Sequence, residues 1–533
     1  MRLGRPTGLA CSRQLCTAAT PKLVKLVSTI GPASEQAEPL AGCVEAGMNV
    51  MRCNFSHATR DEFHLRRNNL RSAPGGEYVS VMLDTKGPEI RMGGLKVCKE
   101  TGNRKAKIQL MAGEPLTLTN DAAFDGASDT ATLFVDYERL ASIVKIGDKI
   151  LLDDGLISLE VVGTNGGSVQ TTVLNSSEIG ERKGVNLPGV VTGLPAMSPK
   201  DIEDIRFGIE YDIDMVAASF VRNAEGVHEI RQHILECHEQ YAGEDAFETP
   251  PPLIISKIES TEALDNLAEI IDASDGIMVA RGDLGVEIPL QNVVTWQKDM
   301  VALCLAAGKP VVVATQMLET MQKNPRPSRA EVADVTNAVL DGADAVMLSG
   351  ESANGQYPVE SVAMQASIVS EVEAWTRQRG FGAEIEPPDL EEDDDELLRR
   401  EESVPEALSA AACFLAARVN ARAIVVFEDG WGETARAVAK HRPSMPIAAL
   451  CDSLKVCRQL SISRGVFPTH ITTPSDEPED YLSLDTIDAA DGCSLVVERL
   501  GLLEPGDLAV VLVGESLSVE TVMEPMDQWT DEE

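Results

Sequence analysis

The sequence has few aromatic residues, a marked shortage of positive charge and no long apolar run. Aromatic side chains make up 4% of its 533 residues, so a core must depend on aliphatic side chains and methionine. The 46 lysines and arginines face 85 aspartates and glutamates, which gives a formal net charge of −39. A field of this sign repels nucleic acid and anionic lipid, so we expect neither nucleic acid nor a membrane as a partner. No apolar run reaches the length of a membrane span.

The 11 cysteines include no Cys-x-x-Cys pair, which favours reduced thiols in the cytosol or an organelle matrix over a disulfide framework. The first acidic residue is Glu35, and Arg2, Arg5 and Arg13 precede it among Ser, Thr and Ala. This bias resembles an organellar transit peptide, and a short disordered tail is the alternative. We therefore expect a cytoplasmic protein, or a mitochondrial or plastid one if residues 1–21 are a transit peptide.

A chain of this length predicts two to four domains, and its first large part alternates aliphatic runs with helical segments. Most of the runs lack period-two alternation, as expected for strands of a parallel sheet that is buried on both faces. Eight such units predict an α/β protein built on a (β/α)8 TIM barrel. The expected strands are 23–30, 49–54, 79–84, 215–220, 253–258, 276–279, 310–315 and 345–348, and expected helices include 260–271 and 289–307.

The helical pattern stops between the third and fourth expected strands. Short alternating runs, separated by Gly and Asp turns, take its place at 116–119, 149–152, 157–162 and 169–173. They predict a small all-β domain inserted after the third barrel strand. We therefore assign 22–87 and 188–383 to the barrel, and 88–187 to an inserted β-barrel domain.

The composition changes again after the barrel. Residues 384–402 are strongly acidic and predict a solvated linker; a calcium or partner site is the alternative, although no EF-hand spacing is present. Residues 403–533 predict a second, smaller α/β domain. Its expected helices are 404–419 and 433–441, and its expected strands are 423–427, 447–450 and 508–513.

Polar residues gather where the barrel strands are expected to end, which is where barrels of this kind carry their active sites. Any one of them could serve only to meet solvent. Together they mix cations, carboxylates and hydroxyls from around the ring, which favours a site. They are Arg52, Asn54, Ser56, Asp84, Thr85, Lys86, Arg91, Ser219, Arg222, Lys257, Glu259, Arg281, Asp283, Thr315, Ser349 and Glu351.

Two segments are the most informative of this set. Lys257 and Glu259 stand two apart on one expected strand, so both point to the same face. Glu259 can ligate Mg²⁺ while Lys257 neutralises transferring charge. Asp283 would complete a metal pair with Glu259, and Gly282 lets the backbone approach a ligand such as a carboxylate. A salt bridge between Lys257 and these acids is the alternative.

Nine motifs, in order, cover almost all of residues 23–375. They are STIGPAS, GMNVMRCNFSHA, MLDTKGPEIR, KGVNLPG, ISKIES, DGIMVARGDLGVE, ATQMLE, KNPRPSRAE and DGADAVMLSGESANGQYP. On these motifs the chain resembles the pyruvate kinase family. The resemblance implies transfer of the phosphoryl group of phosphoenolpyruvate to ADP, giving ATP and pyruvate in the last step of glycolysis. It also implies Mg²⁺ or Mn²⁺ and K⁺ as cofactors, and a homotetramer.

The resemblance further implies individual roles. Lys257 would stabilise the phosphoryl transition state, Arg52 would grip the phosphoryl group, and Thr315 would relay a proton to the enolate through water. The inserted domain would act as a lid that excludes water. The divalent metal would be bound by Glu259 and Asp283; the substrate carboxylate by Gly282, Asp283 and Thr315; K⁺ by Asn54, Ser56, Asp84 and Thr85; and the nucleotide by Asn54, Phe55, Ser56, His57, Arg91 and Lys183.

Two loops refine these expectations about effectors. Glu89 stands where family members that need K⁺ carry glutamate and others carry lysine, so we expect activation by K⁺. Relatives activated by a sugar bisphosphate have a loop rich in Ser, Thr and Gly here, which cradles a phosphate. In this chain the loop reads FEDGWGETAR, and Glu428, Asp429 and Glu433 would repel a phosphate. We therefore expect no activation by fructose 1,6-bisphosphate. GWGETA also matches a dinucleotide fingerprint with Asp452 downstream, although a plain helix start explains it.

Three further alternatives remain. His233 and Cys237, with His238 adjacent, could form a zinc patch, or simply the polar side of an amphipathic helix. Cys53 is interpreted as a core residue. For the whole chain, the competing functions are a Mg²⁺-dependent aldolase or lyase of 2-keto acids, and a non-catalytic regulatory relative.

Overall fold

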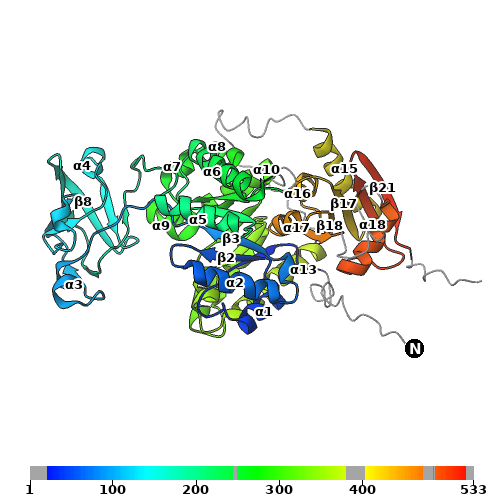
Figure 1. Cartoon of the computed structure of the whole chain (residues 1–533), viewed down its shortest axis with the longest axis horizontal. Coiled ribbons are helices and arrows are strands. Elements are labelled where there is room, and N and C mark those ends of the chain that lie inside the picture. The colour runs from blue at the N-terminus through cyan, green and yellow to red at the C-terminus, as the bar shows by residue number, and fades with distance from the viewer. Residues whose placement is uncertain (1–20, 244–248, 380–402, 472–483, 485–486, 524–533) are drawn as a thin grey trace, which may run out of the picture.

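The computed structural model describes residues 21–243, 249–379, 403–471, 484 and 487–523. Three bodies lie in a row, with the inserted domain at one end, the barrel in the middle and the C-terminal domain at the other end (Figure 1). The acidic linker and all but the last residue of the predicted N-terminal tail lie outside the described residues. No helix in the described parts of the chain is long and apolar enough to cross a bilayer.

The central body is a closed barrel of eight parallel strands, so the predicted fold class is confirmed. The strands run in the order β1-β16-β15-β14-β13-β12-β3-β2, and aliphatic side chains bury both faces. The register sets Asn54 opposite Asp84, and Ala217 beside Asp84, at the carboxyl ends of three neighbouring strands. The strands are β1 (Lys25–Thr29), β2 (Val50–Asn54), β3 (Ser80–Asp84), β12 (Met215–Ala218), β13 (Leu253–Ile258), β14 (Gly276–Ala280), β15 (Val311–Ala314) and β16 (Ala345–Leu348).

Helices surround the barrel, and capping boxes at Thr59, Ser198 and Ser328 begin three of them. The helix expected over 260–271 is interrupted at Asn266, which leaves helical geometry and donates from Nδ2 to the carbonyl of Arg222 at 2.9 Å. The helix expected over 289–307 begins with a 3₁₀ turn, Leu290–Asn292. The α-helices are α1 (Ala37–Glu45), α2 (Arg60–Ser72), α5 (Pro199–Glu210), α6 (Ala224–Ala242), α7 (Thr261–Asp265), α8 (Leu267–Ala273), α9 (Arg281–Glu287), α10 (Val293–Ala307), α11 (Arg329–Leu340), α12 (Gly350–Ala353) and α13 (Pro358–Arg379).

The inserted domain encloses its own apolar core with two sheets, one of six strands in the order β11-β7-β8-β9-β5-β6 and one pairing β10 with β4. It is not purely β, because two short helices, α3 (Lys96–Thr101) and α4 (Leu140–Ile143), interrupt the strands. Its strands are β4 (Ile108–Leu110), β5 (Pro115–Thr119), β6 (Thr132–Phe134), β7 (Lys149–Leu152), β8 (Ile157–Thr164), β9 (Ser168–Val173), β10 (Ser177–Ile179) and β11 (Val185–Asn186).

The C-terminal domain has a five-stranded sheet in the order β19-β18-β17-β20-β21, parallel except for the last strand, with apolar clusters on both faces. Its helices are α15 (Val404–Val419), α16 (Glu433–Lys440), α17 (Leu454–Leu460) and α18 (Ala489–Leu495), and its strands are β17 (Ala423–Glu428), β18 (Ile447–Cys451), β19 (Val466–His470), β20 (Leu508–Val513) and β21 (Ser516–Thr521).

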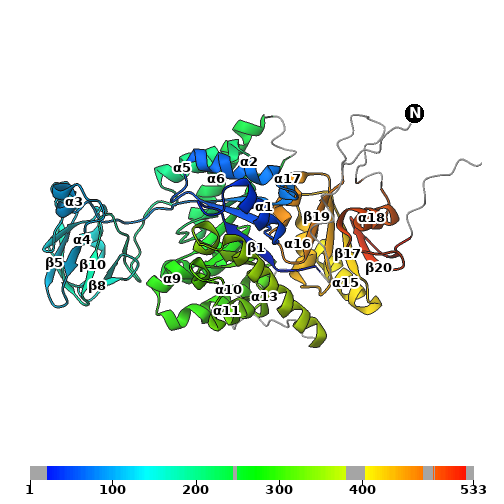
Figure 2. The same ribbon diagram turned by 90° about the horizontal axis from the view of Figure 1, so that it is seen from below.

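The C-terminal domain packs against the amino ends of the barrel strands, on the side away from the insert (Figure 2). Arg458 of α17 reaches Asp214, just before β12, with 2.7 Å between Nε and Oδ1, and Asp214 is fully buried. The hydroxyls of Ser80, at the start of β3, and Ser461 lie 2.7 Å apart. The barrel therefore presents its amino ends to the C-terminal domain and its carboxyl ends to the insert.

Candidate active site

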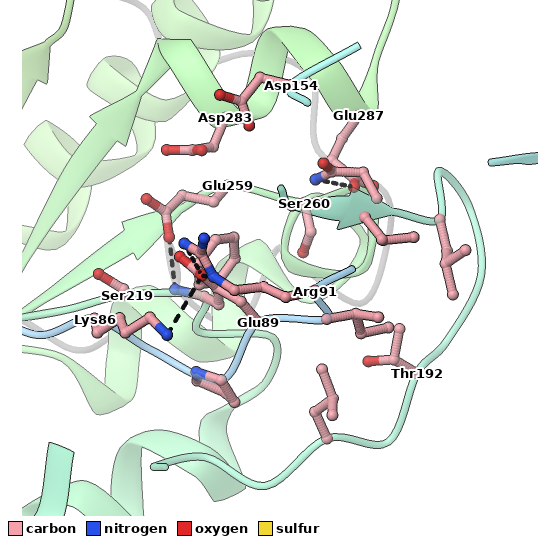
Figure 3. Close-up of a pocket in the computed structure, with 18 of the residues that line it drawn as sticks. Lys86, Glu89, Arg91, Asp154, Thr192, Ser219, Glu259, Ser260, Asp283 and Glu287 are labelled. Carbon is pink, nitrogen blue, oxygen red and sulfur yellow. Dashed lines mark hydrogen bonds and ion pairs between the residues drawn. The ribbon is translucent and has the colours of Figure 1, made fainter. Parts of the chain in front are cut away.

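A cavity of about 1010 Å³ lies at the carboxyl ends of the barrel strands, between the barrel and the insert (Figure 3). Its volume is at the upper end of the range for small-molecule sites, so it has room for two substrates. The barrel contributes Arg52, Asn54, Ser56, His57, Asp84, Ser219, Lys257, Glu259 and Asp283 to its walls, and the insert contributes Arg91, Asp154 and Lys183.

Lys257 stands in the wall of this cavity with three oxygen neighbours. Its Nζ lies 2.8 Å from Ser219 Oγ, 2.9 Å from Glu259 Oε1 and 3.2 Å from Asp84 Oδ1. Burial alone would lower the pKa of Lys257, but the carboxylates of Asp84 and Glu259 outweigh burial and raise it. The ammonium group therefore stays charged at neutral pH. The predicted salt bridge exists, and it is part of the cavity wall.

Arg52 and Asp84 continue this array onto the neighbouring strands. Arg52 donates from Nε to Asp84 Oδ2 at 2.6 Å and from Nη1 to Thr29 Oγ1 at 2.8 Å. Burial acts to raise the pKa of Asp84, but Arg52 and Lys257 overcome that effect and lower it. Cations and carboxylates from β2, β3 and β13 thus alternate along one side of the cavity.

Glu259 and Asp283 bring two carboxylates together. Glu259 is 1% exposed; its Oε2 accepts from the Phe220 amide at 2.6 Å, whereas its Oε1 accepts no hydrogen bond although Lys257 is close. Burial, and then the nearby charge of Glu259, raise the pKa of Asp283 to about 7. Two neighbouring carboxylates, each raising the energy of the other's charged form, need either a shared proton or a cation between them.

Gly282 and Thr315 contact each other and are not among the described residues that line the cavity. The Gly282 amide donates to Thr315 Oγ1 at 2.9 Å, and that hydroxyl donates to the carbonyl of Ala314 at 2.6 Å. Thr315 has a φ of 70°, in the left-handed region, directly after β15. The structure therefore brings these two predicted carboxylate ligands together. The Gly282 amide and the Thr315 hydroxyl are hydrogen-bonded to each other.

The segment that follows β2 lies only partly in the cavity. Asn54 Oδ1 accepts from the Ser56 amide at 3.0 Å, and both residues line the wall. Phe55 instead points into the apolar core, with its ring centroid 5.6 Å from that of Phe63. Its side chain cannot contact a nucleotide in this arrangement. Thr85 is buried, and its Oγ1 accepts from the Ser219 amide at 3.1 Å.

The insert directs its predicted nucleotide contacts toward the same cavity. Lys183 Nζ lies 2.9 Å from Asp153 Oδ1. Arg91 pairs with Glu89 and donates from Nη1 to the carbonyl of Arg182 at 2.9 Å, and Glu89 also lies 3.8 Å from Lys86. The cations that would meet a nucleotide are therefore held by ion pairs.

Comparison with known proteins places the chain in a family. The family model of the pyruvate kinase barrel domain matches residues 21–362, and that of the pyruvate kinase alpha/beta domain matches residues 406–523. The chain belongs to the pyruvate kinase family. The predicted family and its class, a phosphotransferase, are confirmed, and the aldolase or lyase alternative is not supported.

Individual pyruvate kinases match most of the chain. The pyruvate kinase of Bacillus licheniformis is 42% identical over 500 residues, covering 92% of this chain and 77% of its own. Pyruvate kinase PKLR of Homo sapiens is 40% identical over 499 residues, covering 92% of this chain and 82% of its own. The crystal structure of a pyruvate kinase from Cryptosporidium parvum superposes with a TM-score of 0.81 at 38% identity, covering 94% of this chain and 96% of that one.

Sequence reasoning assigned no role to several residues of this pyruvate kinase cavity. Ser219 contacts Lys257, and Glu287 accepts from Asn186 Nδ2 of the insert at 3.2 Å. Asp154 faces Asp283 (Figure 3). The Asp-Asp-Gly sequence at 153–155 was the available signal for Asp154, because it is typical of a turn between two strands.

The remaining predictions concern features outside the cavity. Cys53 is fully buried in the core. His233 Nε2 lies 3.7 Å from Cys237 Sγ, and the described residues include no group of three or more His, Cys, Asp or Glu that could hold a metal. GWGETA does lead into a helix, α16, at Glu433.

Proposed function

We propose that this cavity transfers the phosphoryl group of phosphoenolpyruvate to ADP, giving pyruvate and ATP. The observation that supports this most strongly is the position of Lys257, whose ammonium group is charged, oriented by three oxygens and set in the cavity wall. Phosphoryl transfer needs little covalent help from a protein, so positioned charges supply most of the catalysis.

The carboxylates of Glu259 and Asp283 fit a divalent cation. They lie close enough for a shared hydrogen bond, and Glu259 Oε1 accepts none from the described residues. We propose that they hold Mg²⁺ or Mn²⁺, which supplies positive charge to phosphoryl and enolate oxygens when bound. Hard oxygen donors of this kind suit either ion.

Arg52 and Lys257 are the side chains that would bind the phosphoryl group during its transfer. Asp84 and Thr29 occupy Nε and Nη1 of Arg52, and its Nη2 donates to no described residue. That nitrogen is placed to hold a phosphoryl oxygen of the substrate. Lys257 would neutralise negative charge on the phosphoryl group during the transfer. Its three neighbours orient the ammonium group and do not exclude a phosphoryl oxygen from the cavity.

The substrate carboxylate would bind at Gly282, Asp283 and Thr315. The Gly282 amide now donates to Thr315 Oγ1, so binding would require the carboxylate to replace that hydroxyl as acceptor. The freed hydroxyl of Thr315 would then relay a proton to the enolate through water.

We propose that K⁺ binds at the oxygens of Asn54, Ser56, Asp84 and Thr85. Asn54 and Asp84 are opposite each other in the register of β2 and β3, so their oxygens lie at adjacent strand ends. Turnover in KCl should exceed turnover in tetramethylammonium chloride by roughly tenfold, because a fixed cation near developing charge stabilises it. Equal turnover in the two salts would remove the site.

The nucleotide would meet Arg91 and Lys183 on the insert and residues 54–57 on the barrel, through the backbone alone at Phe55. Closure of the insert would exclude water from the transfer. We also propose a homotetramer, with no nucleic-acid or membrane partner, in the cytoplasm or in an organelle if residues 1–21 are a transit peptide. Sedimentation analysis would test the homotetramer, and sequencing of the mature N-terminus would test the transit peptide.

The central experiment replaces Lys257 by methionine, which keeps length and apolar contact but removes the charge. Lys257→Met should lower ATP formation, measured by a coupled assay, by roughly a thousandfold. Lys323 is an exposed lysine of the barrel, so Lys323→Met is the matched control and should leave the rate unchanged. A Lys257→Met rate within about tenfold of wild type, near 1.4 kcal/mol in the barrier, would contradict the proposal.

A further inference from the structure

Arg281 is a strand-end arginine to which the proposed reaction gives no role. It begins α9, directly after β14, and its side chain is 10% exposed. It is not among the described residues that line the cavity, so it does not reach the space that a substrate would occupy. All three nitrogens of its guanidinium group nevertheless donate hydrogen bonds, and their acceptors indicate what Arg281 does.

Two of these bonds reach the backbone at the end of β15. Arg281 donates from Nε to the carbonyl of Ala314 at 3.1 Å and from Nη2 to the carbonyl of Thr315 at 2.6 Å. These carbonyls belong to the two peptide planes on either side of the Thr315 Cα atom. Because φ and ψ describe how those planes are turned about that atom, one guanidinium group fixes both backbone angles of Thr315.

The backbone conformation that Arg281 holds is one that threonine seldom adopts. Thr315 has a φ of 70° and Gln316 has a φ of 54°, so two consecutive residues other than glycine lie in the left-handed region. A β-branched residue persists in that region only where surrounding contacts impose it. The two hydrogen bonds from Arg281 are contacts of this kind.

The left-handed backbone sets the Thr315 hydroxyl against the Gly282 amide. Thr315 Oγ1 accepts from this amide at 2.9 Å and donates to the carbonyl of Ala314 at 2.6 Å. The same carbonyl accepts from Arg281 Nε, so it joins the guanidinium group to the hydroxyl. The position of the hydroxyl therefore depends on the position of the guanidinium group.

Two neighbouring helices orient the guanidinium group. Asp334 of α11 binds it with both carboxylate oxygens, at 2.7 Å between Nη1 and Oδ1 and 2.8 Å between Nη2 and Oδ2. Gln297 of α10, which is 1% exposed, accepts from Nη1 at 3.2 Å. Only the planar fork of arginine can bind a carboxylate with two prongs and two carbonyls at once; lysine would keep the charge and lose this geometry.

We infer that Arg281, oriented by Asp334, is a positioning residue for Thr315. It holds the hydroxyl where the proton reaches the enolate, without contacting the substrate itself. This inference rests on the proposed function in one respect, since it requires that Thr315 relays the proton. Arg281 should therefore affect the proton step strongly and the phosphoryl step weakly, because Lys257 and Arg52 carry the phosphoryl step on other strands.

Two assays separate these steps. Single-turnover formation of ATP at saturating phosphoenolpyruvate measures phosphoryl transfer. Exchange of the C3 hydrogens of pyruvate in D₂O, followed by NMR with Mg²⁺, KCl and ATP present, measures the proton step. In each cycle of exchange a C3 proton leaves to the relay water, the enolate forms, and a deuteron from the relay returns to C3, so one C–H bond is replaced by one C–D bond.

Arg281→Lys should lower the rate of C3 exchange by roughly tenfold to a hundredfold and single-turnover ATP formation by less than about threefold, because only the proton relay is misplaced. A general distortion of the barrel would instead lower both rates by the same factor. Asp334→Asn keeps Arg281 and weakens its orientation, so it should lower exchange selectively by roughly threefold to tenfold. It supplies the same test if Arg281→Lys does not fold.

A double-mutant cycle shows whether Arg281 acts through the Thr315 hydroxyl. Thr315→Ala removes that hydroxyl and should itself lower C3 exchange. In the Thr315→Ala background, Arg281→Lys should lower exchange by no more than about twofold further, because the group that it positions is already absent. Losses that multiply would mean that Arg281 acts independently of Thr315, and they would overturn the inference.

Arg231 offers a matched control elsewhere in the barrel. It forms a two-pronged pair with Asp275, at 3.1 Å and 3.0 Å, and donates to the carbonyl of Ala273 at 2.8 Å. It is not one of the described residues that line the cavity, so Arg231→Lys should match wild type in both assays.

The outcomes separate failure of the inference from failure of the proposed function. Equal losses in both assays for Arg281→Lys would overturn the inference, as would unchanged exchange in Arg281→Lys while Thr315→Ala lowers it. Unchanged exchange in Thr315→Ala would instead show that Thr315 is not the proton relay, and the inference would fail together with that part of the proposed function.

Discussion

Two buried glutamates, one in the barrel and one in the C-terminal domain, share nearly the same local setting. Glu259 follows β13 and Glu428 ends β17, each at the carboxyl end of a parallel strand and each 1% exposed. In both, Oε1 accepts no hydrogen bond and Oε2 accepts from a backbone amide, that of Phe220 for Glu259 and that of Ala435 for Glu428. By burial and hydrogen bonding alone the two could not be told apart.

Their wider surroundings separate them. Glu259 has Lys257 at 2.9 Å and Asp283 within hydrogen-bonding reach, on a cavity wall built from several strands and from the insert. Glu428 bonds the first turn of the helix that follows its own strand, α16. A buried acid at a strand end therefore does not identify an active site; convergence of opposite charges from several elements on one cavity does.

The strongest test of this comparison makes the same change at both glutamates. Glu259→Gln should lower turnover by roughly a thousandfold and weaken Mn²⁺ binding, because it removes a ligand charge beside the transferring group. Glu428→Gln should leave turnover within about twofold of wild type, in line with a residue outside the site. Steady-state assays and Mn²⁺ titrations check both, and equal losses in the two variants would break the distinction.

A smaller effect is expected at Ser219, which orients Lys257 from outside the metal pair. Ser219→Ala removes an oxygen 2.8 Å from Lys257 Nζ and should lower kcat by roughly tenfold to a hundredfold with little change in KM, since a misplaced catalytic group costs rate more than binding. Ser219→Thr keeps the hydroxyl and should recover most of kcat. A parallel rise in KM for phosphoenolpyruvate would show that Ser219 acts on binding instead.

The pH dependence of stability should distinguish Glu428 from its glutamine variant. Burial raises the pKa of Glu428, and the Ala435 amide offsets this only in part. A carboxyl with a raised folded-state pKa stabilises the fold below its unfolded pKa, and that contribution is lost as pH rises through the folded pKa. Thermal midpoints of Glu428→Gln relative to wild type should therefore increase between pH 4.5 and pH 7. A constant difference would contradict this.

The smallest effect is expected from an added anion. The loop after β17 carries Glu428, Asp429 and Glu433, and the carboxylate of Glu428 already accepts from an amide at the start of α16, where a phosphate would otherwise bind. Fructose 1,6-bisphosphate should therefore leave the KM for phosphoenolpyruvate unchanged. A large drop in KM would show that the acidic loop rearranges to admit phosphate.

The sequence predicted the barrel strands well because their signal is strong. Uninterrupted aliphatic runs have few alternatives to a strand buried on both faces, so all eight appear in the barrel. Weaker signals failed where tertiary contacts decided the outcome. Asn266 breaks a helix by reaching the carbonyl of Arg222, and two short helices in the insert left no periodic pattern long enough to detect.

The site was predictable in its residue types and less so in its contacts. Lys257 and Glu259 could be placed on one face from their spacing alone. That spacing could not show that Phe55 points into the core, or that Thr315 already occupies the Gly282 amide, because both depend on neighbours distant in sequence. Asp154 was missed for the same reason, since it meets the site only through the packing of the insert.

The contacts between the C-terminal domain and the barrel have a mechanical consequence. The strand β3 begins at Ser80, against Ser461, and ends at Asp84, against Lys257. The neighbouring β12 begins beside Asp214, against Arg458, and leads to Ser219. A strand of this length spans about 15 Å and resists stretching. A displacement of α17 would therefore be transmitted along the backbones of β3 and β12 to the neighbours of the Lys257 ammonium group. No loop would have to rearrange.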